Sequence, residues 1–64
     1  MKVYAVQILQ HTVGEWEDST ELWATSYVNA RSEKDAIRRV HIPRGYDYGS
    51  SRIEYFAEAS EAQI

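Results

Sequence analysis

The sequence predicts an α+β domain of the order β-β-α-β, in which one helix packs on one face of a three-stranded antiparallel sheet. Three observations predict this fold: two strand-like segments joined by a polar loop, one well-capped helical segment, and a third strand-like segment near the end. The 64 residues are enough for a single domain, residues 1–64. A right-handed crossover through the helix places the third strand beside the first, so the expected strand order is 2-1-3.

The first two strands are predicted over residues 2–11 and 21–30. In "KVYAVQILQH" the side chains of Tyr4, Val6 and Ile8 alternate with a second set, which is typical of a strand with two distinct faces. "ELWATSYVNA" alternates in the same way. The segment between them, "TVGEWEDST", contains Gly14 and several acidic residues. It predicts a hairpin loop longer than the tight two-residue kind.

The helix is predicted from "RSEKDAIRRV". Ser32 is a good N-cap because its hydroxyl can accept a hydrogen bond from the first-turn amides, and Asp35 follows three residues later as in a capping box. We expect the helix to end by about Ile42, because the residue before Pro43 disfavours the helical region. The apolar stripe consists of Ala36, Ile37 and Val40.

The last third of the chain is predicted to hold a loop, a strand and a tail. "PRGYDYGSS" reads as a loop with Gly45 and Gly49 as its turn points. "RIEYFAEA" is the third strand, with Ile53, Tyr55 and Ala57 on one face. Residues 59–64 form a polar tail that we expect to fray.

One helix can cover only one face of such a sheet. The expected helix-facing residues are Tyr4, Val6, Ile8, Leu22, Ala24, Val28, Ile53 and Tyr55. The expected residues of the other face are Val3, Ala5, Leu9, Trp23, Tyr27 and Phe56. The second set is a large apolar and aromatic surface for a monomer to leave in water, so we expect the open face, or an edge beside it, to be a protein interface.

No pattern in the sequence points to catalysis, a metal or a cofactor. There is no cysteine, and His11 and His41 are too far apart in sequence to suggest a zinc site. Phosphate-binding and nucleophile motifs are absent. The acidic pairs fall in the predicted loop and tail, where water surrounds them, so we expect them to be ordinary surface charges. We therefore expect a protein that is not an enzyme.

The charge is unevenly distributed along the chain. Residues 31–52 carry a balance of +3, whereas the rest carries −6. The basic part holds Arg38, Arg39, Arg44 and Arg52 together with Tyr46 and Tyr48. Guanidinium groups and aromatic rings are the components of a nucleic-acid-binding surface, so a nucleic-acid-binding module using residues 38–52 is one interpretation. The alternative is that the arginines pair with Asp47 and the glutamates and cap the helix end.

Protein binding is the other interpretation, because Tyr, Trp and Arg dominate binding hot spots. Trp16 lies among acidic residues in the predicted hairpin loop. Either it anchors a basic partner or it folds back over the sheet edge. The complete set of candidate contact residues is Trp16, Trp23, Tyr27, Arg38, Arg39, Arg44, Tyr46, Tyr48, Arg52 and Phe56.

The pattern "LWATSYVNARSEKDAIRR", with the run A-x-S-x-x-D-A-I from Ala30 to Ile37, resembles small phage-encoded proteins that disable host machinery. It is similar to the short T7-type inhibitor of bacterial RNA polymerase in its "WAT" strand and in its order of strand, hairpin, strand, helix and strand. It also resembles some anti-CRISPR proteins, which open with "MK" and an aromatic-rich strand. The resemblance assigns no individual residue a role.

This resemblance implies a non-catalytic inhibitor that blocks a host protein or protein–nucleic-acid complex, of the CRISPR effector or RNA polymerase class, with anti-CRISPR as the sharpest version. The expected location is the cytoplasm of a bacterial host, since the chain shows no signal peptide and no apolar run long enough to span a bilayer. A homo-oligomeric accessory protein that pairs through the open sheet face remains a further alternative.

Overall fold

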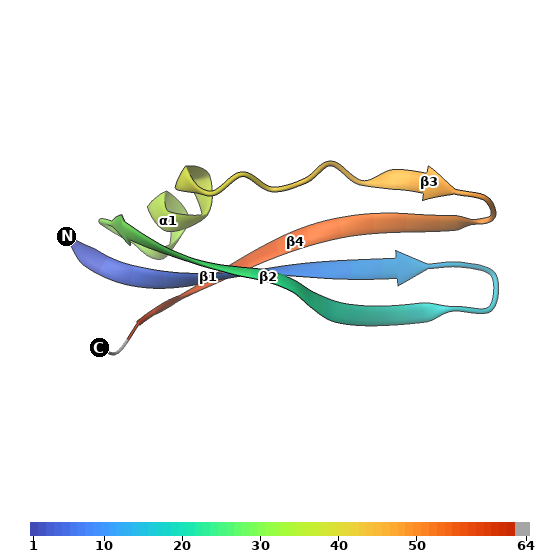
Figure 1. Cartoon of the computed structure of the whole chain (residues 1–64), viewed down its shortest axis with the longest axis horizontal. Coiled ribbons are helices and arrows are strands. Elements are labelled where there is room, and N and C mark those ends of the chain that lie inside the picture. Colours follow the sequence, from blue (N-terminus) through green and yellow to red (C-terminus); the bar gives the residue numbers. More distant parts are fainter. Residues whose placement is uncertain (63–64) are drawn as a thin grey trace.

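The computed structural model describes residues 1–62, and it is an α+β fold with one helix and one antiparallel sheet (Figure 1). The elements are β1 (Lys2–Val13), β2 (Asp18–Ala30), α1 (Glu33–Arg39), β3 (Tyr46–Tyr48) and β4 (Ser51–Glu61). The strand order is β2-β1-β4-β3. The expected class is confirmed, and the predicted third strand, which is β4, lies beside β1 as expected. The predicted strand count of three is wrong, because the sheet has four strands.

The additional strand, β3, comes from the segment that was predicted to be a loop. Tyr46 pairs with Ile53 and Tyr48 pairs with Ser51, so β3 and β4 form a hairpin. The turn is made by residues 49–50, and Gly49 has a φ of 60°, a left-handed conformation that glycine adopts without strain. The strand signal was weak because β3 has only three residues, fewer than the usual five or six.

The loop that joins β1 to β2 is shorter than predicted. Val13 already pairs with Asp18. Gly14 and Glu17 exchange backbone hydrogen bonds of 2.6 and 3.5 Å, which leaves only two residues at the tip. The longer loop was expected because Ser19 and Thr20 are polar, yet both lie in β2 and are exposed. Polar side chains are compatible with a strand that faces water.

Residues 59–61, which were expected to be part of a frayed tail, belong to a strand. Ala59, Ser60 and Glu61 continue β4 and pair with β1, and the backbone amide of Ala62 donates to Val3 at 2.9 Å. Because β1 begins at Lys2, it supplies partners for these residues, and alternation of small and polar side chains is enough for strand pairing. Residues 63–64 of the predicted tail lie outside the described part of the chain.

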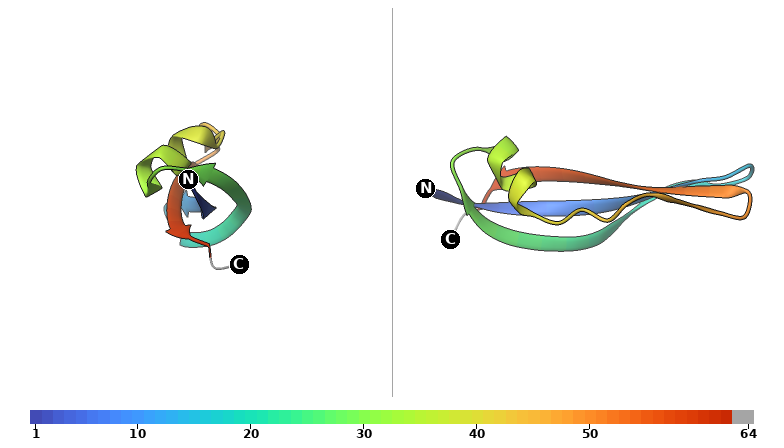
Figure 2. Two further views of the ribbon diagram at one scale, coloured as in Figure 1. Left: turned by 90° about the vertical axis from the view of Figure 1, so that its left-hand side faces the viewer. Right: turned by 90° about the horizontal axis from the view of Figure 1, so that it is seen from above.

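The molecule is elongated, with principal dimensions of 43 × 18 × 13 Å. The helix α1 packs at one end of the sheet, near both termini, and both hairpin turns lie at the other end (Figures 1 and 2). The buried cluster consequently lies under the helix and comprises Tyr4, Val6, Ala30 and Ala36. We call the sheet face that carries this cluster the helix-side face, and the opposite face the open face.

A β-bulge in β2 reverses the expected orientation of two residues. Ile8 pairs with Ala24 but Leu9 pairs with Leu22, so Trp23 is the extra residue. Leu22, expected under the helix, shares the open face with Leu9 and is 57% exposed. Trp23, expected on the open face, lies against Tyr55 with ring centroids 5.5 Å apart. One extra residue inverts the facing of the residues before it, because side chains alternate along a strand.

The start of the helix is capped as predicted. The Ser32 hydroxyl accepts a hydrogen bond from the Asp35 amide at 3.1 Å. The Asp35 carboxylate accepts from the Arg31 amide at 3.1 Å and from the Arg39 guanidinium at 3.0 Å. The helix ends at Arg39, earlier than the expected limit near Ile42, and the next residue, Val40, is extended with φ −102° and ψ 137°. The β-branched Val40 favours this extended conformation.

Replacing Ser32 with alanine should lower the free energy of unfolding by about 1 kcal/mol, because the Asp35 amide loses its side-chain acceptor. Chemical denaturation at neutral pH measures the change. Ser50→Ala, in the exposed turn, is the control and should change stability by less than about 0.5 kcal/mol. Equal effects of the two substitutions would show that the cap contributes nothing specific.

Asp35 should make stability depend on pH. The hydrogen bond from the Arg31 amide, followed by that from Arg39, lowers the pKa of Asp35 below its ordinary value of 3.8. A lowered folded-state pKa contributes stability that is fully present above the unfolded pKa and is lost as the pH falls through the folded pKa. The stability difference between the wild type and Asp35→Asn should therefore be constant near neutral pH and shrink below about pH 4. A difference that stays constant through this range would contradict the assignment.

Candidate protein-binding surface

The two hairpin turns form a single tip, which we call the distal end: residues 14–17, residues 49–50 and the strand ends that they join (Figure 1). The turns lie side by side, because β1 pairs with β4 as far as Val13 and Arg52. A Cβ atom placed on Gly14 would lie 2.7 Å from the Ser51 hydroxyl oxygen, so a side chain at residue 14 would force that hydroxyl to move. Backbone pairing therefore holds the two hairpins together at the end farthest from α1.

Trp16 is the most exposed large side chain of the distal end. It is 93% exposed and sits at the corner of the β1–β2 turn between Glu15 and Glu17. The alternative in which Trp16 folds back over the sheet edge is therefore wrong. Exposure of a whole indole ring to water is unfavourable, and it is typical of a residue that is buried on binding.

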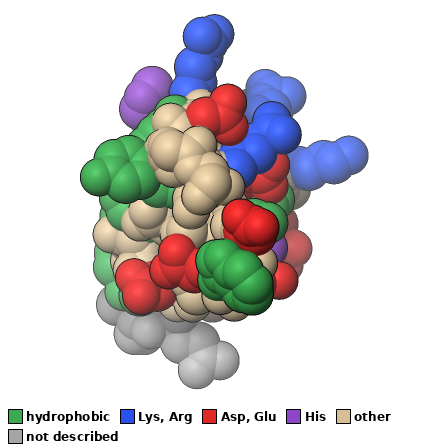
Figure 3. All heavy atoms as spheres, turned by 90° about the vertical axis from the view of Figure 1, so that its right-hand side faces the viewer, with side chains coloured by type: hydrophobic (Ala, Val, Ile, Leu, Met, Phe, Trp, Pro, Cys, Tyr) green, Lys and Arg blue, Asp and Glu red, His purple; other side chains and the backbone are tan. Residues whose placement is uncertain are grey.

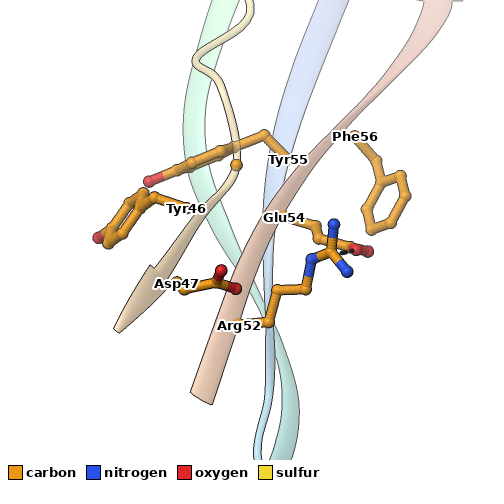
Figure 4. A pocket seen from close by; sticks show the side chains of 7 residues that line it. Tyr46, Asp47, Arg52, Glu54, Tyr55 and Phe56 are labelled. Carbon is orange, nitrogen blue, oxygen red and sulfur yellow. Dashed lines mark ion pairs between the residues drawn. The ribbon is translucent and has the colours of Figure 1, made fainter. Parts of the chain in front are cut away.

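The second hairpin adds aromatic side chains to the same end. Tyr48 is 72% exposed, and Tyr46 is about half exposed. Tyr46 and Tyr55 lie on one side of β4, whereas Glu54 and Phe56 lie on the other (Figure 4). Desolvation raises the pKa of the Tyr55 hydroxyl, and the neighbouring Tyr46 hydroxyl raises it further.

These rings belong to a row that crosses the helix-side face from edge to edge. Trp23 of β2 contacts Tyr55 of β4 in an edge-on arrangement with an interplanar angle of 71°. Tyr46 of β3 continues the row beyond Tyr55. Trp23 and Tyr46 are exposed because α1 lies at the opposite end of the sheet and does not reach them. Flat aromatic groups of a partner could stack on this row of rings. The row was not predicted from the sequence, because it depends on the bulge that turns Trp23 toward Tyr55.

The open face carries a separate apolar patch. Leu9 pairs with Leu22 on one side and with Phe56 on the other, so these three side chains lie next to each other across three strands. His11 lies beside the patch, 6.0 Å from the Phe56 ring, and its Nε2 is 2.5 Å from Asp18 Oδ1. Three aromatic residues were expected on the open face. Tyr27 and Phe56 lie there, because they pair with Ala5 and Leu9 of β1, and Trp23 does not.

The candidate arginines are spread along the molecule. Arg38 and Arg39 are at the helix end, Arg44 is in the linker before β3, and Arg52 is near the distal end of β4 (Figure 1). In the sheet, Arg52 pairs with Asp47 of β3, and Arg44 lies just before that strand, so these two arginines lie near the β3 tyrosines. Arg38 and Arg39, in contrast, lie on α1. Viewed from the distal end, lysine and arginine side chains lie along one side of the molecule, and most acidic side chains lie elsewhere (Figure 3).

Two of these arginines already have carboxylate partners. Arg39 binds Asp35, and Arg52 Nε lies 3.3 Å from Glu54 Oε1. The Arg52–Glu54 pair is exposed, and such pairs contribute little stability, so a stronger external anion can displace it. In the other pair, Asp35 is partly buried. Arg38 and Arg44 form no ion pair within residues 1–62 and are exposed. They are the arginines most available to a partner.

An open groove of about 370 Å³ follows the β3–β4 hairpin (Figure 4). It is lined by Gly45, Tyr46, Asp47, Arg52, Glu54, Tyr55 and Phe56. One alternative from the sequence was that the arginines pair with Asp47 and the glutamates, and the ion pair between Arg52 and Glu54 is of this kind. The groove lined by Tyr55 was not predicted. The useful signal was Gly45, because a Cβ there would come within 2.7 Å of the Ile53 carbonyl oxygen and would push the chain away from β4.

Within residues 1–62, no group of three His, Cys, Asp or Glu side chains is arranged to hold a metal ion. In the same part of the chain, no helix has the length and apolar character needed to cross a membrane. The sequence matches no protein-family model, and the comparisons with curated proteins and with solved structures find no relative. The surface geometry therefore carries the functional argument by itself.

Gly45→Ala should destabilise the protein by roughly 1–3 kcal/mol, because the new methyl group meets a backbone carbonyl that cannot move away easily. Urea denaturation measures the loss. Ser50→Ala, in the turn of the same hairpin, is the matched control and should behave like the wild type. An unchanged midpoint for Gly45→Ala would mean that the linker is free to move off β4.

Proposed function

We propose that this protein is a non-catalytic binding protein that docks by its distal end onto a larger protein or protein–nucleic-acid complex and blocks it sterically. The observation that carries the proposal is the exposure of Trp16, in the β1–β2 turn, and Tyr48, next to the β3–β4 turn, on two hairpins that are joined by the pairing of β1 with β4. Aromatic side chains on a rigid support lose little conformational entropy on binding, which is why they dominate hot spots.

The charges at the distal end favour a partner whose surface carries both positive and negative charge. The β1–β2 turn carries Glu15, Glu17 and Asp18 around Trp16, which favours a basic surface. Arg52 and Arg44 lie on the β3–β4 side, which favours an acidic surface or a phosphate backbone. Protein complexes that hold nucleic acid present both kinds of surface side by side. The narrow, elongated shape suits insertion into the cleft of such a complex.

The resemblance to phage-encoded inhibitors supports a host complex of the CRISPR effector or RNA polymerase class as the target. The most specific form of the proposal is an anti-CRISPR protein acting in the cytoplasm of a bacterial host. In this form, the distal end occupies a site that the complex needs for nucleic acid, and no chemical step is required of the inhibitor.

A nucleic-acid-binding module is the second candidate. The aromatic row of Trp23, Tyr55 and Tyr46 favours it, because bases stack on exposed rings, and Arg38 and Arg44 are available to phosphates. The negative net charge of the chain, −3, opposes it, because nucleic-acid-binding domains are usually basic.

Capture from a nuclease-treated bacterial lysate by the tagged chain should recover a discrete protein complex, and a Trp16→Ala/Tyr48→Ala variant should lose it. Because both side chains are exposed, the variant should keep its stability within about 1 kcal/mol, and the same denaturation experiment confirms that it is folded. Lys34→Ala, on the exposed side of α1, is the control and should capture normally. The captured complex, once identified, should then lose its own enzymatic or nucleic-acid-binding activity when the purified protein is added.

Two other outcomes contradict the proposal. Recovery of nucleic acid that disappears with nuclease, weakens steeply with salt and is lost in an Arg38/Arg39/Arg44→Glu variant would favour the nucleic-acid-binding module. Equal capture by the wild type and the Trp16→Ala/Tyr48→Ala variant would show that the distal end is not the docking surface.

A further inference from the structure

The outer edge of β2 is the longest unpaired strand edge of the sheet. β2 has 13 residues and pairs only with β1, so its outward-facing amides and carbonyls have no strand partner within residues 1–62. The other edge of the sheet is different: β3 has three residues, and α1 and the linker of residues 40–45 run alongside the remainder of β4 (Figures 1 and 2). Natural proteins usually protect a long edge, because it readily pairs with another strand.

The C-terminal half of β2 has none of the usual protection along its edge. Residues 24–30, "ATSYVNA", contain no charge, no proline and no glycine, and Tyr27 at their centre is 69% exposed. Short uncharged segments that favour the strand conformation are the ones that pair with another chain. The bulge at Trp23 ends this regular stretch on one side, and the chain leaves the strand after Ala30 on the other.

Opposite charges flank the stretch at its two ends. Glu21 lies before the bulge, and Arg31 follows the strand directly. Within residues 1–62, neither side chain takes part in an ion pair. An antiparallel copy of the same strand would bring the acidic end of one against the basic end of the other, whereas a parallel copy would place like charges together. The edge is therefore complementary to itself in the antiparallel direction only.

We propose that β2 pairs antiparallel with β2 of a second copy of this chain, about a two-fold axis near Tyr27. This pairing matches residues 24–30 with themselves and joins two four-stranded sheets into one continuous sheet. Arg31 of each copy then lies beside the bulge and Glu21 of the other, and the two Tyr27 rings lie next to each other across the axis. Each chain has one such edge, so the assembly closes as a dimer and does not extend into a filament.

The dimer is independent of the proposed docking function, because it uses a different surface. Trp16 and Tyr48 are outside the paired stretch and stay exposed at the two far ends. The interface is a strand edge, not the apolar open face that the sequence suggested for a homo-oligomer. A failure of lysate capture and a failure of dimerisation are therefore separate results.

Sedimentation equilibrium of the purified full chain tests the proposal. The wild type should be a dimer, and Tyr27→Lys should raise the dissociation constant by more than about tenfold, because two lysines then face each other across the axis. Tyr48→Lys is the matched control, since it makes the same exchange at an equally exposed tyrosine on the opposite edge. It should remain dimeric.

Two further variants distinguish this edge from any other dimer surface. The chain has no cysteine, so a single Tyr27→Cys substitution should give a disulfide-linked dimer on mild oxidation, whereas Tyr48→Cys should not. Glu21→Arg and Arg31→Glu should each weaken the dimer, and the double exchange should restore it. A wild type that is monomeric at the highest attainable concentration overturns the proposal. So does a dimer that Tyr27→Lys leaves intact and Tyr27→Cys does not crosslink.

Discussion

The difference in length between one short helix and three long strands determines how this molecule packs. α1 has seven residues, and β1 and β2 have 12 and 13. A helix rises about 1.5 Å per residue and a strand about 3.3 Å, so α1 covers only a fraction of the sheet length. The main buried cluster therefore lies at one end, where Val6, Ala30 and Ala36 are fully buried. Every surface discussed above follows from the remaining length of uncovered sheet.

Stability and binding are consequently separated along the molecule. The helix end holds the buried cluster and the hydrogen bonds of Asp35 and Ser32 that cap the helix. The distal end is held mainly by backbone pairing between strands and by two close approaches at glycine, Gly14 and Gly45. A surface that contributes little to folding is free to carry exposed Trp16 and Tyr48, because their removal costs no core packing.

Besides the apolar patch of the open face, the uncovered sheet has three candidate binding surfaces of different kinds. The distal end presents side chains, the helix-side face presents a row of rings that includes Trp23 and Tyr55, and the edge of β2 presents backbone groups. Side-chain surfaces select a partner by shape and charge, whereas a strand edge selects by direction and register. The proposed docking at the distal end and the proposed pairing at the β2 edge therefore do not compete for the same surface.

Much of the fold could be predicted because it depends on residues close together in the chain. The alternation around Val6, the Ser32 cap and the break before Pro43 predict two strands, a helix start and a helix limit from neighbouring residues alone. The right-handed crossover then places β4 beside β1. The candidate residues Trp16, Tyr27, Tyr48 and Phe56 are exposed in the structure, as binding residues need to be.

By itself, the sequence determined the class of the fold, the order of its long strands and the supply of aromatic and charged side chains. Only the tertiary structure decided where those side chains point. The bulge at Trp23, the pairing of β3 with β4 and the separation of the arginines between α1 and β4 depend on how distant segments align. The register between two strands depends on many weak contacts along their whole length, so it cannot be predicted from residues that are neighbours in the sequence.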